Sequence, residues 1–198
     1  MFAPQLLLAS QSPRRAELLR QIGLRFVVAP ADVAEGARAG ETAADYARRI
    51  ALEKARAGWQ ASDRRLPALG ADTDVVLDGR ILGKPRGRDE ALAMLAALAD
   101  RVHEVYSAVA LVDGTREALA LSVTQVAFGP IAAAQAEAYW ASGEPADKAG
   151  AYGIQGLGAL FVREIRGSYS GVVGLPLYET AALLEQFAIR PLSFPAHS

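Results

Sequence analysis

Three lysines, Lys54, Lys84 and Lys148, are the most distinctive chemical feature of this sequence. The chain of 198 residues has 21 basic side chains, and all the others are arginines. A compositional drift toward arginine replaces surface lysines readily, because both residues serve as solvated cations there. It replaces a lysine less readily where a compact ammonium contacts a ligand. The three lysines are therefore candidates for chemistry, with chance survival as the alternative.

Lys54 follows Tyr46 and Ile50 at intervals of four residues, in a segment predicted to be helical from Thr42 to about Trp59. This spacing puts its ammonium group on the apolar side of the helix. A charged group in that position either extends to solvent along its aliphatic stem or faces a polar cleft. The helix by itself does not distinguish these two outcomes.

Carboxylates suited to activating water or holding a metal ion occur in Gly70-Ala71-Asp72-Thr73-Asp74. We expect an apolar strand to end here and to lift Asp72 out of the core, a usual place for a general base or a metal ligand. Asp72 and Asp74 would share one face of the extended chain. A simple polar turn is the alternative. Glu35 lies in an irregular segment near glycines and could add another carboxylate.

A predicted helix begins at Pro13, directly after Ser10 and Ser12 and with Arg14 and Arg15 in its first turn. The free N–H groups and the dipole of a helix start attract anions. Arginines add charged donors that match phosphate oxygens, although they oppose the dipole when no anion is bound. An ordinary Ser-Pro cap with exposed arginines explains the same residues without a ligand.

A glycine-rich segment from Gly143 to Gly158 contains Lys148 and Gln155. Its glycines would let the backbone approach a ligand closely, and an amide side chain offers both a donor and an acceptor to a base edge. Tyr152 and Ile154 are too apolar for a solvated linker, so we expect an ordered binding loop rather than a flexible one.

The elements that must position these residues mix helices with both hairpins and helix crossovers, which indicates an α/β fold with a mixed sheet in one domain spanning residues 1–198. Strands are predicted at residues 6–9, 26–29, 69–71, 75–77, 80–82, 102–112, 115–128 and 159–165. Helices are predicted from residue 13 to about 22, and at residues 42–59, 89–98, 132–141 and from about 176.

Composition excludes several classes of protein. A net charge of −1 provides no field for stable binding of nucleic acid or of an anionic membrane. Cysteine is absent, which removes disulfides and thiol chemistry. The apolar run near the N-terminus is too short for a signal peptide or a membrane span, so we expect a cytoplasmic protein. His103 lies in a predicted strand and His197 near the terminus, and neither is expected to act in metal binding or acid–base chemistry.

Seven segments in order resemble the Maf family of nucleotide pyrophosphatases, once described as septum-formation inhibitors. They read LASQSPRRAELL, EKA, GADTDVV, GKP, VHEVYSAVAL, GEPADKAGAYGIQGLG and GSYSGVVGLPL, and they extend from about Leu6 to Leu184. All three lysines fall within them. The sequence departs from the family pattern at Gln11, where a small residue is usual, and at Ser107-Ala108, where Thr-Gly is common.

The resemblance implies an elongated mixed sheet flanked by helices, like that of inosine-triphosphate pyrophosphatases, with two lobes around a cleft and often a homodimer. It implies a divalent cation, Mg²⁺ or Mn²⁺, with Glu35 and Asp72 as its ligands. It makes Asp72 the general base. The residues that it implies for substrate binding are Ser10, Arg14, Arg15, Lys54, Thr73, Lys84, Lys148 and Gln155.

Two branches of the family differ at three of these positions. The branch acting on 7-methyl-GTP tends to have an aromatic residue, a glutamine and a glutamate where this chain has Arg14, Thr73 and Gln155. A carboxylate and an aromatic face suit a cationic methylated base, whereas a neutral amide suits a pyrimidine edge. We therefore expect hydrolysis of dTTP and UTP, or of modified pyrimidine nucleotides, to a monophosphate and pyrophosphate in a house-cleaning role. A 7-methyl-GTP pyrophosphatase and a non-catalytic nucleotide-binding inhibitor of septum formation remain alternatives.

Overall fold

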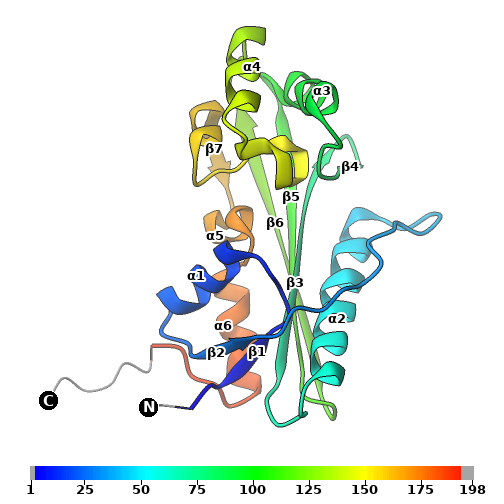
Figure 1. Cartoon of the computed structure of the whole chain (residues 1–198), viewed down its shortest axis with the longest axis vertical. Coiled ribbons are helices and arrows are strands. Elements are labelled where there is room, and N and C mark those ends of the chain that lie inside the picture. The colour runs from blue at the N-terminus through cyan, green and yellow to red at the C-terminus, as the bar shows by residue number, and fades with distance from the viewer. Residues whose placement is uncertain (1–2, 193–198) are drawn as a thin grey trace, which may run out of the picture.

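The computed structural model describes residues 3–192, in which a seven-stranded mixed sheet has helices on both sides (Figure 1). The strands are β1 (Leu6–Leu8), β2 (Phe26–Val28), β3 (Ala68–Leu77), β4 (Arg80–Leu82), β5 (Val102–Val112), β6 (Glu117–Phe128) and β7 (Val162–Arg166). The helices are α1 (Pro13–Gln21), α2 (Ala43–Ala61), α3 (Arg88–Leu98), α4 (Ala133–Ala141), α5 (Tyr169–Val173) and α6 (Leu177–Gln186). Three 3₁₀ helices, η1 (Glu144–Asp147), η2 (Ala149–Ala151) and η3 (Leu157–Phe161), shape the glycine-rich segment.

The sheet has the order β2-β1-β3-β5-β6-β7, and β4 pairs with β3. β1 is parallel to β2 and to β3, whereas the pairs from β3 through β7 are antiparallel. The long strands β3, β5 and β6 run the length of the molecule and connect two ends (Figure 1). α1, β1, β2 and α6 lie at one end, and α3, α4 and the 3₁₀ helices lie at the other. The α/β class and the mixed sheet predicted from the sequence are confirmed.

Small residues let α2 lie close against the sheet. Ala47, Ala51 and Ala55 of the helix pack on Ala108 and Ala110 of β5 in a separate apolar cluster. Gly70 of β3 faces the same helix, and a Cβ added there would overlap the backbone of α2. This close approach brings the side chains of α2 within reach of the middle of β3.

Several local predictions are confirmed. The Thr42 hydroxyl accepts a hydrogen bond from the backbone N–H of Asp45 at 3.2 Å and caps α2. Both predicted hairpins form, and each turns at a glycine with positive φ, Gly79 at 74° and Gly114 at 85°. Glycine suits these positions because it has no Cβ to oppose a left-handed backbone.

The prediction that a strand ends before Asp72 is wrong. β3 continues unbroken to Leu77, because its central residues pair with β5, Asp72 opposite Ala108 and Asp74 opposite Tyr106. The backbone N–H and C=O groups of this segment therefore form hydrogen bonds within the sheet, while the two carboxyl groups face the space beside α2. A polar face in mid-strand is tolerated here because that space is a cleft rather than core.

The strand predicted at residues 159–165 is also partly wrong. η3 occupies the first part of that range, and β7 begins only at Val162. The short helix α5 was not predicted from the sequence. Ser168 caps it by accepting a hydrogen bond from the N–H of Gly171 at 3.0 Å. Both differences follow from tertiary contacts that override weak local patterns in segments of about five residues.

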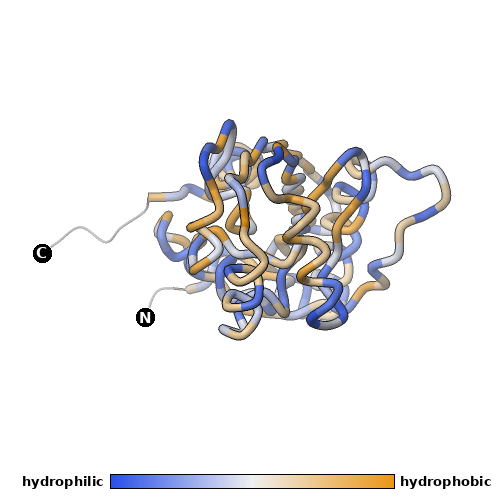
Figure 2. The backbone as a smooth tube through the Cα atoms, turned by 90° about the horizontal axis from the view of Figure 1, so that it is seen from above, coloured by the Kyte–Doolittle hydropathy of each residue, from blue (hydrophilic) through white to orange (hydrophobic). Residues whose placement is uncertain are grey.

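The segment between β2 and α2 extends outward from the body of the molecule, as the two views along different directions agree (Figures 1 and 2). Figure 2 shows that polar residues alternate with less polar ones along this segment. Within residues 3–192, no helix is long and apolar enough to cross a membrane.

Candidate active site

A cleft of about 1130 Å³ lies beside the middle of β3, between the two ends of the molecule. Its walls come from the β1–α1 connection, the β2–α2 segment, β3, the β4–α3 connection and the glycine-rich segment. Every site residue predicted from the sequence lines this one cleft, namely Ser10, Arg14, Arg15, Glu35, Lys54, Asp72, Thr73, Lys84, Lys148 and Gln155. Segments far apart in the chain therefore contribute to a single polar space.

Lys54 occupies the centre of the acidic wall. Its Nζ donates a hydrogen bond to Asp72 Oδ1 at 2.7 Å and lies 2.6 Å from Glu35 Oε1. The lysine is only 9% exposed, so it faces the cleft rather than extending to solvent. The close packing of α2 at Gly70 places the ammonium group at this wall. Of the two outcomes considered for Lys54, extension to solvent or a position facing a polar cleft, the structure shows the second.

Glu35 reaches this centre from the exposed β2–α2 segment. Burial opposes its ionisation, but the hydrogen bond and charge of Lys54, together with the charge of Lys84, lower the pKa of Glu35 below its ordinary value. Arg49 of α2 holds the segment in place, donating to the Gly36 carbonyl at 2.9 Å and to both oxygens of Glu41 at 2.6 and 2.7 Å. The carboxylate is thus carried by a loop that is tied to the same helix as Lys54.

Asp74 is not among the site residues predicted from the sequence, although its spacing places it on the same face of the strand as Asp72. It lines the cleft and is 7% exposed. Burial, followed by the charge of Asp72 and a hydrogen bond with it, raises the pKa of Asp74 to about 8. Within the described part of the chain, Asp74 Oδ2 is buried without a hydrogen-bond partner.

Arg15 joins three segments at another wall of the cleft. It donates to Ser10 Oγ at 3.1 Å, to Thr73 Oγ1 at 3.4 Å and to the Gly174 carbonyl at 2.9 Å. Burial lowers the pKa of its guanidinium group. The Thr73 hydroxyl also donates to Gly174 at 3.3 Å. Ser12, the predicted helix cap, stands at the cap position of α1 but makes no side-chain capping hydrogen bond.

Three further cations, Lys148, Arg14 and Lys84, line the same cleft. Lys148 Nζ donates to Asp147 Oδ1 and to the Glu144 carbonyl, both at 2.7 Å. The Arg14 guanidinium group of α1 lies 3.9 Å from Asp147 Oδ2, and Asp147 is the last residue of η1. Lys84 is exposed on the cleft wall. These three cations line the cleft, and Arg14 and Lys148 share the carboxylate of Asp147.

Glu144 organises the glycine-rich segment, which is ordered as expected. Its carboxylate accepts hydrogen bonds from Tyr139 Oη at 2.6 Å and from the backbone N–H groups of Leu157 and Gly158 at 2.8 and 3.1 Å. A Cβ at Gly156 would overlap this carboxylate. Gln155 therefore lines the cleft from a turn whose backbone is held by hydrogen bonds to the Glu144 carboxylate.

His103 is not part of the cleft wall. His103 is buried in the core, where its Nε2 lies 2.8 Å from Tyr152 Oη and its ring meets Phe128 edge to face. Burial lowers the pKa of His103 to about 4. His197 lies outside the described residues.

The donor set fits a divalent cation of the Mg²⁺ type. Glu35 and Asp72 direct carboxylate oxygens at one point, since both contact Lys54 Nζ. Within residues 3–192, no three His, Asp or Glu side chains are already gathered in metal-binding geometry. Mg²⁺ does not need such a group, because it commonly takes one or two carboxylates together with water and substrate phosphates.

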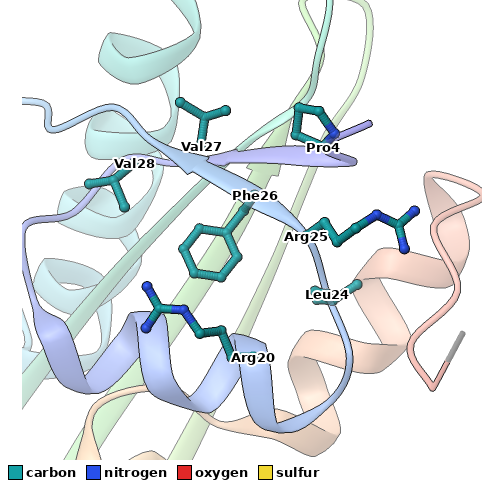
Figure 3. Close-up of a pocket in the computed structure, with 7 residues that line it drawn as sticks. All are labelled: Pro4, Arg20, Leu24, Arg25, Phe26, Val27 and Val28. Atoms are coloured by element: carbon teal, nitrogen blue, oxygen red, sulfur yellow. The ribbon is translucent and has the colours of Figure 1, made fainter. Parts of the chain in front are cut away.

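A second, smaller pocket of about 420 Å³ lies against β2, at the edge of the sheet (Figure 3). Its wall includes Phe26, with the Arg20 guanidinium 5.3 Å from the ring centroid, and the partly exposed side chains of Val27 and Val28. It contains neither a carboxylate nor any of the predicted site residues. The chemistry of the described molecule is therefore concentrated in the larger cleft.

Comparison with known proteins agrees with the motifs that line this cleft. A family model described as Maf-like protein matches residues 5–187. The chain belongs to the Maf-like family. Its relatives in this family include the dTTP/UTP pyrophosphatase of Saccharophagus degradans, which is 53% identical over 93% of this chain and 89% of that protein. The dTTP/UTP pyrophosphatase of Methylococcus capsulatus is also 53% identical, over 93% of this chain and 92% of that protein.

Among solved structures, this Maf-like chain is similar to a nucleoside-triphosphatase (dITP/XTP pyrophosphatase) from Mycobacterium abscessus. The sequence identity is 21%, the match covers 92% of this chain and 94% of that one, and the TM-score is 0.45.

The departure from the Maf pattern at Ser107-Ala108 lies next to the cleft. Ser107 is opposite Thr73 and Ala108 opposite Asp72 in the pairing of β3 with β5. The buried Ser107 hydroxyl donates to the Gly171 carbonyl at 2.6 Å and so ties α5 to the sheet. The hydroxyl needed for this contact is present in serine as it would be in threonine.

Proposed function

We propose that this Maf-like protein hydrolyses dTTP and UTP to the corresponding monophosphate and pyrophosphate, with Mg²⁺ or Mn²⁺ as cofactor. The single observation that supports this most is the convergence of five cationic side chains and a lysine-bound aspartate on one cleft. The names of relatives that are about half identical over most of the chain support the choice of substrate.

The charges of the cleft suit a triphosphate. A nucleoside triphosphate brings three to four negative charges, and its hydrolysis depends on positioned cations and an activated water. Arg14, Lys84 and Lys148 lie where they can neutralise phosphate oxygens, and Arg14 and Lys148 would exchange Asp147 for them. A bound divalent cation would add Lewis-acid stabilisation of the phosphate charge.

Asp72 is the proposed general base. Its Oδ1 is held by Lys54, which fixes the orientation of the carboxylate on the rigid middle of β3. In the proposed reaction, water attacks the α-phosphorus, Asp72 takes a proton from that water, and pyrophosphate leaves. Lys54 therefore acts on the base as well as contributing charge to the phosphate site.

Base recognition is proposed for the wall that contains Gln155, with Arg14 and Thr73 nearby in the same cleft. A uracil or thymine edge has carbonyl acceptors beside an N–H donor, which a carboxamide can match on both counts. A 7-methylguanine carries a positive charge, and the neutral amide of Gln155 provides no opposite charge to attract it. The arrangement thus favours a neutral pyrimidine over a cationic purine.

A panel of triphosphates tests this proposal. We expect pyrophosphate release from dTTP and UTP in the presence of Mg²⁺ or Mn²⁺, and loss of that release in a chelator. A kcat/KM for 7-methyl-GTP well above that for UTP would contradict the substrate assignment. Release of orthophosphate in place of pyrophosphate would contradict the proposed site of attack.

A further inference from the structure

Asp74 is the most anomalous polar residue of the cleft. The residue is only 7% exposed, and its buried Oδ2 has no hydrogen-bond partner among the described residues. A buried carboxyl oxygen without a partner is unfavourable, and most such atoms in proteins are satisfied. An unsatisfied atom at the wall of a binding cleft indicates that its partner arrives with a ligand.

Strand geometry directs Asp74 toward the same space as Asp72. The two residues are separated by one position on β3, and their side chains therefore leave the sheet on the same face. Uninterrupted pairing with β5, through Ala108 and Tyr106, keeps that register fixed. A ligand that reaches Asp72 is therefore within a short distance of Asp74.

The cations already present do not satisfy Asp74. Lys54 Nζ pairs with Asp72 Oδ1 and Glu35 Oε1. Arg15 directs its three hydrogen bonds to Ser10, Thr73 and Gly174. Among residues 3–192, Asp74 forms no ion pair within 4 Å, whereas the neighbouring carboxylates of Glu35 and Asp72 both pair with Lys54. The unmatched oxygen in this part of the cleft thus belongs to a carboxyl group, which can bind a divalent cation once it is ionised.

We propose that Asp74 is an additional carboxylate ligand of the divalent cation used by this site, acting beside Asp72. The inference rests on the metal dependence in the proposed function. An oxygen ligand on a rigid strand suits Mg²⁺ or Mn²⁺, both of which prefer hard oxygen donors. Asp72 and Asp74 would supply two carboxylates, and water and the triphosphate would complete the coordination shell, since no group of three such ligands is gathered within residues 3–192.

Substitution of Asp74 by asparagine tests the proposal, because the amide keeps the shape of the carboxyl group and cannot ionise to a carboxylate ligand. Mn²⁺ binding to the whole protein is measured by calorimetry and by electron paramagnetic resonance, with and without a non-hydrolysable dTTP analogue. We expect Asp74→Asn to weaken Mn²⁺ binding by about tenfold or more. Affinity for the nucleotide analogue in a chelator should be unchanged or slightly higher, since a neighbouring acid is removed.

Asp78→Asn is the matched control. Asp78 lies at the end of the same strand, is exposed, and pairs with Arg101 outside the cleft. Asparagine tolerates its positive φ of 51°, so the hairpin should be kept. This variant should bind Mn²⁺ as the wild type does. Asp74→Ser provides a second test if the asparagine variant does not fold, because it removes the carboxylate and leaves room for water.

The outcomes separate this inference from the proposed function. Unchanged Mn²⁺ affinity in folded Asp74→Asn, with metal-dependent pyrophosphate release intact in the wild type, would overturn the role of Asp74 alone. Such a result would make Asp74 a structural partner of Asp72. A wild type that neither binds Mn²⁺ nor releases pyrophosphate would overturn both. Selective loss of Mn²⁺ affinity in the Asp74 variants, with Asp78→Asn unaffected, would support the proposal.

Discussion

Lys54 and Asp72 come from different elements, 18 residues apart, and meet through a 2.7 Å hydrogen bond in the wall of the cleft. The contact joins the middle of α2 to the middle of β3. It exists because α2 lies against a strand that carries glycine at position 70. The chemistry of the site therefore depends on how closely one helix packs against one strand.

Replacing Lys54 should impair catalysis strongly. Lys54→Met keeps the aliphatic stem but removes the charge between Glu35 and Asp72, leaving both carboxylates without their shared cation. We expect kcat to fall by about 10²–10³-fold, the range for loss of one positioned charge or donor in an active site. Steady-state pyrophosphate release measures this effect.

Lys54→Arg is the informative companion. The guanidinium group keeps the positive charge but is wider and planar, so it does not reproduce the two short contacts of the ammonium. It should lose most of the activity as well. Full activity in Lys54→Arg would mean that only net charge matters at this position.

Gly70→Ala should separate α2 from β3. The added methyl group overlaps the backbone of Ala51 and Ala55, and forced overpacking of this kind costs about 1–3 kcal/mol. The free energy of unfolding, from denaturant titration, should fall by that amount. Activity at a temperature where the variant is folded should also fall, since Lys54 moves with the helix. Gly129→Ala is the control, because nothing lies within 4 Å of its added Cβ.

The sequence predicts the parts of this molecule that depend on local chemistry. Thr42 and Asp45 identify the start of α2, and the Asp-Gly pairs identify both hairpins. The segments that line the cleft were recognised together by their motifs, although nothing local shows that Ser10 and Gln155 face the same space. That convergence comes from the sheet order, which a linear pattern does not contain.

Other features could not be predicted from one sequence. The continuation of β3 past Asp72 depends on pairing with β5, a strand some thirty residues away in the chain. The spacing placed Asp74 on the same face as Asp72, but its unpaired oxygen results from where Lys54 and Arg15 direct their hydrogen bonds. The structural role of Glu144 cannot be recognised from the sequence, because the three groups that donate hydrogen bonds to its carboxylate surround it only after folding.

Glu144→Gln tests the role of that carboxylate in positioning Gln155. One oxygen becomes an NH₂ group, which would oppose a donor from Tyr139, Leu157 or Gly158. Hydrogen bonds to a charged acceptor contribute about 1.5–3 kcal/mol, so we expect KM for dTTP to rise by about tenfold or more, with a smaller change in kcat. Glu137→Gln, which removes a surface pair with Arg88, should leave both constants unchanged. An unaltered KM in a folded Glu144→Gln would show that the turn does not depend on this anchor.

The buried His103 should make stability depend on pH. Burial lowers its pKa from 6.5 to about 4, so between these values the unfolded chain binds a proton that the folded chain does not. Its contribution to stability is complete above pH 6.5 and is lost as the pH falls toward 4. The loss is on the order of 3 kcal/mol. Comparing the free energy of unfolding of the wild type with that of His103→Gln across this range isolates the effect. Parallel pH profiles for the two proteins would contradict it.

The most direct test of the account is a paired measurement on Asp72→Asn, which keeps the shape of the side chain and removes its ability to take a proton. Pyrophosphate release from dTTP with Mg²⁺ and binding of a non-hydrolysable dTTP analogue are measured on the same preparations. We expect hydrolysis to be abolished and analogue binding to be largely kept, because the cations of the cleft remain. Hydrolysis by Asp72→Asn at the wild-type rate would contradict it.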